Sequence, residues 1–314
     1  MSLLLAVTGW QPDLWLTLFR AEAGGRAVIE AGDQYDPTSI AYAAVWKPVP
    51  GSLARLPNLK AIFNLGAGVD ALLADKTLPG APIVRVVDPD LTQRMTEYVV
   101  WQVLHHHRGG THYAARQAER LWQPVTDQPA AADVRVGILG LGVLGRDAAG
   151  ALVRLGFKVS GWSRSGGPMP GIRCFRGLSE LDAFLAATDI LVVLLPLTPE
   201  TRGILNRDLF RKLARDGRLG GPILINAGRG ALQVEADVLA ALDDGTLIGA
   251  SLDVFETEPL PSGNPIWRHP KVVATPHVAA DSDPRHLVSY VMRQISAFES
   301  GGGLENIVDR TKGY

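Results

Sequence analysis

Short apolar runs alternate with longer helix-compatible stretches along most of the chain. Apolar runs of strand length occupy positions 3–7, 41–46, 61–65, 83–87, 134–139, 159–162, 190–195, 223–225 and 272–274. Continuous apolar strands that alternate with helices are typical of a parallel sheet covered on both faces, which is α/β architecture. The run 190–195 is the clearest case, because it is entirely aliphatic, is bounded by Asp189 and Pro196, and is far too short to cross a membrane. We predict it to be a central strand.

Two longer stretches divide the chain. Residues 96–121 are helix-compatible, with an interruption at Gly109 and Gly110, and precede a loop that contains two prolines. A second helical pattern opens at the segment 281–284 and stops at residues 299–303, where three glycines follow each other. We expect the first stretch to connect two domains, and the last helix could pack on either of them.

Composition and charge narrow the class of protein. The chain has 314 residues, 46% of them hydrophobic, so it is long enough for about two domains. Its 31 basic and 32 acidic residues nearly cancel, which argues against a nucleic-acid or anionic-membrane partner. The apolar start of the chain is too short for a membrane span and reads as a first strand. Cys174 is the only cysteine, which excludes an internal disulfide and fits a cytoplasmic location.

The strongest local motif is a glycine turn between a strand and a helix. Residues 134–139 are apolar, and Gly140, Gly142 and Gly145 follow, before a helix-compatible stretch from 146 to 155. The first glycine permits a tight turn, the second lets the backbone approach a pyrophosphate, and the third lets helix and strand pack closely. A glycine triplet alone would be a weak signal, but the flanking strand and helix favour a dinucleotide site over an ordinary turn.

The end of the next strand bears on which dinucleotide is bound. An acidic residue in this place accepts hydrogen bonds from the ribose 2′-hydroxyl of NAD. Here the sequence has Ser163, Arg164 and Ser165, which offer donors suited to a 2′-phosphate. We therefore predict NADP, with NADPH preferred over NADH, although NAD could also serve. The alternative is that Arg164 is a solvated cation or stacks on adenine without discriminating.

The last third of the chain holds residues suited to carbonyl reduction. Arg229, Glu258 and His277 lie in or next to loops that follow predicted strands. Loops at the carboxyl ends of parallel strands form the ligand crevice of an open α/β sheet. Reduction of a keto acid needs a cation for the carboxylate and the carbonyl, and an acid for the developing alkoxide. Taken singly, Arg229 could instead pair with Asp253, and Glu258 could be an ordinary loop carboxylate.

These motifs resemble, in type and in order, those of the D-2-hydroxyacid dehydrogenase family, over essentially the whole chain. They are the glycine turn and the segments Asn-Ala-Gly-Arg-Gly, Asp-Val-Phe-Glu-Thr-Glu-Pro-Leu and Thr-Pro-His. The resemblance implies that His277 is the acid/base, that Glu258 hydrogen-bonds its other ring nitrogen, and that Arg229 binds the substrate. It places Asp253 near the nicotinamide. It also implies further cofactor contacts, at Val143, Leu144, Leu195, Pro196, Ala227 and Gly228.

Substrate clues come from the first hundred residues. Backbone amides around Leu65, Gly66, Ala67 and Gly68 could bind a carboxylate, although a simple strand-to-helix turn would also use these glycines. Trp46 could cover the pocket and exclude bulky side chains, or could belong to the core. With the segments ending at Asp70, Tyr98 and Ser165, these residues most resemble the glyoxylate/hydroxypyruvate reductase A branch of the family. We therefore expect a small 2-keto acid, and another short 2-hydroxy acid stays the alternative.

The resemblance implies two doubly wound parallel-sheet domains. Residues 100–283 would form a Rossmann dinucleotide-binding domain, and residues 1–99 with 284–314 a flavodoxin-like substrate domain. A homodimer is expected from the family. We predict no metal site, because the consecutive histidines 105–107 point in different directions on a helix and have no carboxylate cluster beside them. A different class stays open, since the C-terminal binding protein corepressors share these motifs and act as dinucleotide-sensing binding proteins.

Overall fold

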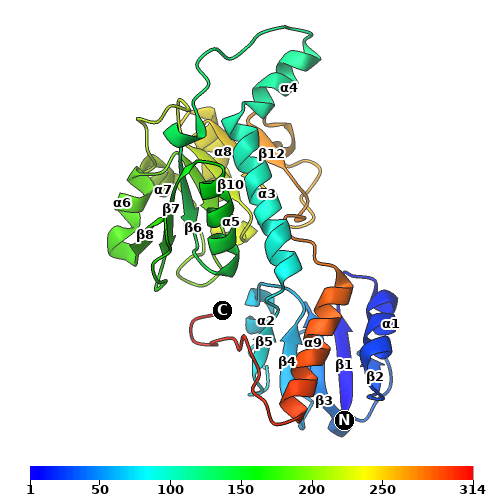
Figure 1. The fold of residues 1–314 in the computed structure, drawn as a ribbon. Coiled ribbons are helices and arrows are strands. Elements are labelled where there is room, and N and C mark those ends of the chain that lie inside the picture. The colour runs from blue at the N-terminus through cyan, green and yellow to red at the C-terminus, as the bar shows by residue number, and fades with distance from the viewer. Residues whose placement is uncertain (314) are drawn as a thin grey trace. The chain divides into compact units, whose positions relative to one another are not determined.

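The chain folds into two compact units. The computed structural model describes residues 1–313. One unit joins Met1–Leu91 to the segment from Ser282 onward, and the other is formed by Thr92–Asp281 (Figure 1). Each unit has its own parallel sheet with helices on both faces, as expected from the alternation of apolar runs and helical stretches.

The first unit is built on a five-stranded sheet in the order β2-β1-β3-β4-β5, in which every paired strand is parallel. This is the strand order of flavodoxin-like folds, so the predicted fold of this unit is confirmed. The strands are β1 (Ser2–Val7), β2 (Val28–Glu30), β3 (Ile40–Trp46), β4 (Ala61–Asn64) and β5 (Ile83–Arg85). The helical elements are α1 (Pro12–Glu22), η1 (Pro37–Ser39), α2 (Asp70–Leu73) and α9 (Pro284–Glu299).

Both faces of this sheet are apolar and covered. On one face, residues of β1, β3 and β4 pack against α1 and α9, with Phe19 and Val291 fully buried. On the other face, alternate residues of the same strands pack against Leu53, Leu56 and Leu72. Side chains alternate between the faces of a strand, which explains why these strands are apolar throughout. The last helix therefore packs on the first unit, which settles the alternative left open by its sequence.

The second unit has a seven-stranded parallel sheet in the order β12-β11-β10-β9-β6-β7-β8. Its strands are β6 (Arg135–Leu139), β7 (Lys158–Ser163), β8 (Arg173–Arg176), β9 (Ile190–Val193), β10 (Ile223–Asn226), β11 (Gly249–Leu252) and β12 (Val272–Ala274). Read from β8, the order is that of a Rossmann fold, and the strand order reverses between β6 and β9. The predicted Rossmann fold is confirmed.

Helices cover both faces of the larger sheet (Figure 1). They are α3 (Pro89–His107), whose first turn contains the unit boundary, α5 (Val143–Arg154), α6 (Leu181–Ala186), α7 (Arg207–Arg211) and α8 (Glu235–Asp243). Helix α4 (Gly110–Ala118) projects from this unit and has no buried residue (Figure 1). The second unit also contains four 3₁₀ turns: η2 (Ala131–Asp133), η3 (Leu178–Glu180), η4 (Gly230–Leu232) and η5 (Pro265–Arg268). Strand β9 is buried along its whole length, as predicted for a central strand. None of the helices in residues 1–313 has the length and apolar character needed to cross a membrane.

Three strands and one helix start differ from the prediction. Strands β2, β8 and β11 were not predicted, because each is only three or four residues long and lacks a continuous apolar run. Helix α3 begins at Pro89 rather than near residue 96. Asp88 precedes this proline and its carboxylate accepts a hydrogen bond from the Leu91 amide at 3.2 Å. An Asp followed by a Pro is a helix-start signal, and it outweighed the weak periodicity of the first two turns.

Candidate active site

The loop that carries His277 follows the edge strand β12, next to the carboxyl end of β11. The His277 amide donates to the carbonyl oxygen of Asp253 at 2.8 Å, which ties the two loops together. His277 itself has a φ of 56°, in the left-handed region that is uncommon for a residue with a side chain. Such a conformation persists only where the surroundings hold it in place, and it marks this loop as a candidate functional element.

The imidazole of His277 is paired with the carboxylate of Glu258. Nδ1 of His277 lies 2.8 Å from Oε2 of Glu258, and the other carboxylate oxygen accepts from the Phe255 amide at 3.2 Å. An ionised carboxylate only accepts, so Nδ1 carries the hydrogen in this pair. Nε2 makes no hydrogen bond to residues 1–313. The His277 side chain is 39% exposed, so its second nitrogen can reach a ligand.

Asp253 stabilises the loop that carries His277. Its side chain is 1% exposed, and its carboxylate accepts hydrogen bonds from the Thr275 hydroxyl at 2.7 Å and from the Val278 and Ala279 amides at 2.9 Å each. A buried carboxylate needs such partners, and these bonds fix the backbone on both sides of His277. They account for the burial of Asp253 without requiring an ion pair to Arg229. The expectation that Asp253 also lies near a nicotinamide stays a prediction.

Tyr98 is a supporting residue that the sequence did not assign to the site. Its hydroxyl lies 2.9 Å from that of Thr275, whose own hydroxyl donates to Asp253. Burial, the largest cause, and the negative charge of Asp253 raise the pKa of Tyr98 far above its ordinary value, so the phenol stays protonated and donates to Thr275. The signal was weak, because a tyrosine within a predicted connector helix can serve many purposes. Only the fold shows that α3 passes beside the Thr-Pro-His segment.

Arg229 lies just after β10 and just before the 3₁₀ turn η4. Its guanidinium donates to the carbonyl of Gly228 at 2.8 Å, and the side chain is half-buried. The neighbouring glycines are required by close packing. A Cβ on Gly230 would lie 1.8 Å from the Phe255 carbonyl oxygen, and one on Gly228 would lie 3.0 Å from that of Leu195. The Gly-Arg-Gly segment therefore passes directly against the loops after β9 and β11, and so brings Arg229 to the edge where His277 lies.

The glycine turn after β6 has the cradle that a pyrophosphate requires. Gly140 has a φ of 120°, and a Cβ there would lie 2.8 Å from the backbone of Leu194. A Cβ on Gly145 would lie 2.0 Å from the Gly140 carbonyl oxygen, which explains the close approach of α5 to the strand. Nothing lies within 4 Å of the position of a Cβ on Gly142, so this residue faces open space at the helix start. The first amides of α5, from Val143 and Leu144, are thus oriented for an anion.

The loop after β7 presents Arg164 and Ser165 as exposed side chains. Ser163 is half-buried, and its hydroxyl oxygen accepts from the Gly166 amide at 2.9 Å, which leaves its own hydrogen for another acceptor. Arg146 on α5 donates to the carbonyls of residues 167 and 168 and so holds this loop against the helix. The pKa of Glu200 is lowered, first by hydrogen bonding to Thr198 and also by the positive charge of Arg164.

The first unit holds the candidate carboxylate-binding segment. The buried Asn64 donates from Nδ2 to the carbonyl oxygens of Gly66 at 2.7 Å and Gly68 at 3.0 Å. These bonds turn the two carbonyls toward Asn64. The amide of Leu65 donates to the Val45 carbonyl at 2.9 Å. It is therefore not available to a ligand, contrary to the prediction. In the described part of the chain, the amides of residues 66–68 have no such partner.

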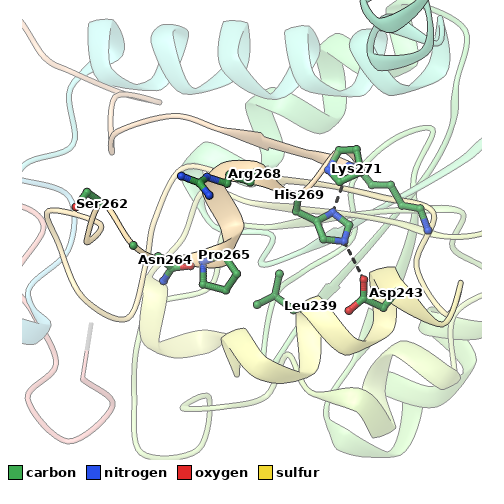
Figure 2. A pocket seen from close by; sticks show the side chains of 10 residues that line it. Leu239, Asp243, Ser262, Asn264, Pro265, Arg268, His269 and Lys271 are labelled. Atoms are coloured by element: carbon green, nitrogen blue, oxygen red, sulfur yellow. Dashed lines mark hydrogen bonds and ion pairs between the residues drawn. The ribbon is translucent and has the colours of Figure 1, made fainter.

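A separate pocket of about 660 Å³ lies in the second unit (Figure 2). It is lined by Asp243 at the end of α8 and by Lys271 just before β12, that is, at the amino edge of the strands. His269 lies 3.4 Å from Asp243 within it. None of the predicted site residues belongs to its lining. The candidate active site is at the opposite, carboxyl edge of the sheet, because the chemistry-bearing loops converge there.

Asp88, Asp90 and His286 in the first unit offer ligand atoms within 4.8 Å of one another. Asp88 accepts from the Leu91 amide, and Asp90 accepts from the Asp283 amide at 3.3 Å. Both carboxylates therefore organise the starts of helices, and these roles explain the grouping without a metal ion.

Comparison with known proteins agrees with this fold. The family model described as D-isomer specific 2-hydroxyacid dehydrogenase, NAD binding domain, matches residues 100–279. A structure of an NADPH-dependent glyoxylate/hydroxypyruvate reductase from Sinorhizobium meliloti, with NADP and sulfate, is 48% identical with a TM-score of 0.95, and the match covers 100% of both chains. A probable 2-hydroxyacid dehydrogenase from Rhizobium etli, with NADP, HEPES and L(+)-tartaric acid, is 45% identical with a TM-score of 0.95 over 100% of this chain and 99% of the other. A D-isomer specific 2-hydroxyacid dehydrogenase from Xanthobacter autotrophicus, with NADPH and MES, is 42% identical with a TM-score of 0.93 and the same coverage.

Proposed function

Since the chain belongs to the D-isomer specific 2-hydroxyacid dehydrogenase family, we propose that it reduces a short 2-keto acid, glyoxylate or hydroxypyruvate, with NADPH. The observation that carries this proposal is the His277–Glu258 pair at 2.8 Å, with the second imidazole nitrogen open to a ligand. It is the arrangement that a proton donor for a developing alkoxide needs. The products are the 2-hydroxy acid and the oxidised cofactor.

In this proposal His277 supplies the proton. As a hydride adds to the keto carbon, negative charge develops on the carbonyl oxygen. The Nε2–H of the imidazolium donates to that oxygen and leaves a neutral imidazole, whose hydrogen stays on Nδ1 because Glu258 accepts it. The Glu258 carboxylate stabilises the charged form before the transfer and fixes the ring orientation. The backbone held by Asp253 keeps the ring where the oxygen develops its charge.

Arg229 is proposed as the second group that acts on the substrate. A guanidinium offers paired donors that match a carboxylate, and it also withdraws charge from a carbonyl oxygen. The tight packing of Gly228 and Gly230 supports this role, because it positions Arg229 between two closely packed backbone segments. In the first unit, the amides of residues 66–68 are proposed to receive the carboxylate.

The cofactor is proposed to bind along the carboxyl edge of the seven-stranded sheet. NADPH supplies the hydride. The open space at Gly142 and the amides of Val143 and Leu144 fit its pyrophosphate. Contacts from Leu195, Pro196, Ala227 and Gly228 are part of the same proposal.

The preference for NADPH is supported by the loop after β7. It has no carboxylate where NAD enzymes have one, and Arg164 and Ser165 extend into solvent beside Ser163. The relatives from Sinorhizobium, Rhizobium and Xanthobacter were solved with NADP or NADPH. A homodimer in the cytoplasm is proposed on family grounds.

Steady-state turnover tests the proposal. The purified protein is given glyoxylate, hydroxypyruvate, pyruvate or a branched 2-keto acid, with NADPH or NADH, and cofactor oxidation is followed. We expect the highest kcat/KM for glyoxylate or hydroxypyruvate with NADPH. A clear preference for NADH would overturn the cofactor assignment, and a preference for the branched acid would overturn the substrate assignment. Tight NADPH binding without turnover of any acid would favour a dinucleotide-sensing binding protein instead.

A further inference from the structure

Three tryptophans of the first unit form a continuous stack. The rings of Trp15 and Trp10 are 5.0 Å apart at an interplanar angle of 10°, and those of Trp10 and Trp46 are 4.7 Å apart at 8°. Trp15 is buried in the core beside Phe19, whereas Trp10 and Trp46 are half-buried. The stack therefore runs from the core of the unit to the carboxyl edge of its sheet, where β1 and β3 end. Trp10 links the anchored ring of Trp15 to the ring of Trp46.

The far end of this stack meets the candidate carboxylate-binding segment. A Cβ on Gly66 would lie 2.1 Å from Cζ3 of Trp46, so the six-membered ring occupies the space that any larger residue at position 66 would need. The backbone after the tryptophan is also constrained, because Lys47 has a φ of 45° and its ammonium lies 5.6 Å from the Trp46 ring. The amide of Thr8 donates to the Trp46 carbonyl at 3.0 Å. Trp46 is thus held beside the open amides of residues 66–68.

We propose that Trp10 is a positioning residue that sets the size of the acid this enzyme accepts, by stacking on Trp46 and holding its ring against Gly66. This inference rests on the proposed function. A ring fixed in this place limits the space next to the carboxylate-binding amides. Stacked aromatic pairs contribute beyond simple area burial, and an indole has few rotatable bonds, so this wall resists displacement by a larger substrate.

The stack explains features that burial alone does not. Two half-buried tryptophans at a sheet edge expose apolar surface, which a purely structural core would avoid by using smaller side chains. Gly66 lies at a buried position where alanine would displace the indole. Both the half-buried tryptophans and Gly66 are explained if the Trp46 ring must occupy one fixed position.

Substitution of Trp10 tests the proposal. The Trp10→Leu variant keeps an apolar side chain but cannot stack. We expect the ratio of kcat/KM for 2-ketoisovalerate to that for glyoxylate to rise about tenfold, the discrimination that one or two methyl groups provide in a pocket. We also expect KM for glyoxylate to rise more than kcat falls, because the proton donor lies on another loop. The Trp10→Phe variant should restore the ratio toward that of the unaltered enzyme. As a matched control, Trp267→Leu removes a half-exposed tryptophan of the second unit and should leave the ratio unchanged.

A double-mutant cycle separates positioning from a merely structural role. Trp46→Leu should raise the same ratio, and adding Trp10→Leu should change it no further, because Trp10 acts through Trp46. Independent, multiplicative effects would overturn the proposal, as would an unchanged ratio in a folded Trp10→Leu variant. If that variant does not fold, Trp10→Met replaces it and is read in the same way.

A binding measurement distinguishes failure of this inference from failure of the proposed function. If no acid is turned over, calorimetric titration of both acids into the NADP⁺ complex measures the size preference without chemistry. Tighter binding of glyoxylate, lost in Trp10→Leu, would support the inference even then. Equal or tighter binding of the branched acid, or no binding of either, would overturn it.

Discussion

His277 and His106 lie in the same unit, and their surroundings use the imidazole in opposite ways. His277 faces a carboxylate, keeps its second nitrogen open, and lies on a loop with a left-handed backbone. His106 lies on α3 and packs against β11, with Nε2 2.8 Å from the Ser251 hydroxyl and the ring against Gly249. Desolvation by burial, and then the charge of His105, lower the pKa of His106 to about 3. The first region leaves one imidazole nitrogen open beside a carboxylate partner, and the second keeps the imidazole neutral.

The difference shows that neighbours, not residue type, decide what a histidine does. The Ser251 hydroxyl donates to the Gln102 side-chain oxygen at 2.6 Å, so it accepts from Nε2 of His106, which must be the neutral tautomer with its hydrogen there. A run of three histidines attracts more attention in the sequence than the single His277. Of these four histidines, only His277 has both a carboxylate partner and an accessible nitrogen, which proton transfer requires.

The largest effect is expected from replacing His277. A His277→Gln variant keeps a polar side chain but removes the proton donor, so kcat should fall about 10²- to 10⁴-fold. Steady-state kinetics with NADPH and glyoxylate measure this, and the circular dichroism spectrum checks the fold. The matched control is His106→Gln, which should retain kcat. Near-normal turnover in the His277 variant would contradict the assigned role.

A smaller loss is expected from Glu258→Gln. The amide can still accept from the imidazole, but it no longer stabilises a positive ring. Hydrogen bonds to charged groups contribute about 1.5–3 kcal/mol, so kcat should fall roughly tenfold to a hundredfold. Steady-state kinetics with NADPH and glyoxylate measure this loss. An unchanged kcat would mean that Glu258 only shapes the loop.

The contrast between His277 and His106 can be tested by measuring the free energy of unfolding as the pH is lowered. His106 binds a proton in the unfolded chain below about pH 6.5 but not in the folded one until about pH 3. The contribution of this group to the free energy of unfolding should therefore be complete above about pH 6.5. It should fall on acidification, by about 1 kcal/mol per pH unit. Urea unfolding at several pH values measures the slope. In His106→Phe the slope between pH 6 and pH 4 should be shallower, and an equal slope would show that other groups dominate.

The smallest effect is expected from Tyr98→Phe. The variant removes only the hydroxyl that bonds Thr275, so unfolding free energy should fall by about 1 kcal/mol and kcat by a few-fold. Chemical denaturation and kinetics on the same preparation measure both. Tyr113→Phe on α4, with an exposed ring, is the control for loss of a phenol. A loss of kcat as large as that of Glu258→Gln would mean that Tyr98 acts on the reaction more directly than through the loop.

The sequence predicted the two α/β folds because long apolar strands carry a strong signal. Strands such as β9 and β3 are buried on both faces, so their runs are continuous and easily recognised. Strand β8 is at an edge and alternates with charged residues, and it was missed. The start of α3 was misplaced because the Asp-Pro signal at 88–89 precedes a polar first turn. Local capping chemistry would have corrected it.

The sequence allowed candidate site residues to be named, but not the residues that hold them in place. Arg229, Glu258 and His277 could be named because their types, order and positions after strands fit carbonyl reduction. The role of Thr275 and Tyr98 depends on which helix passes beside the loop, and no local pattern encodes that. The commitment of the Leu65 amide to Val45 also follows only from the register of β3 and β4. Tertiary hydrogen bonds thus decided what the sequence left open.

The most direct test of the account is to follow the hydride itself. NADPH that carries deuterium at both C4 positions of the nicotinamide is incubated with glyoxylate and the enzyme, and the product is analysed by mass spectrometry and proton NMR. We predict glycolate with one deuterium bonded to carbon 2 and one equivalent of NADP⁺, while the hydroxyl hydrogen comes from solvent through His277. Recovery of unlabelled glycolate, or of labelled cofactor with unchanged glyoxylate, would contradict the claim that this protein is a 2-keto acid reductase.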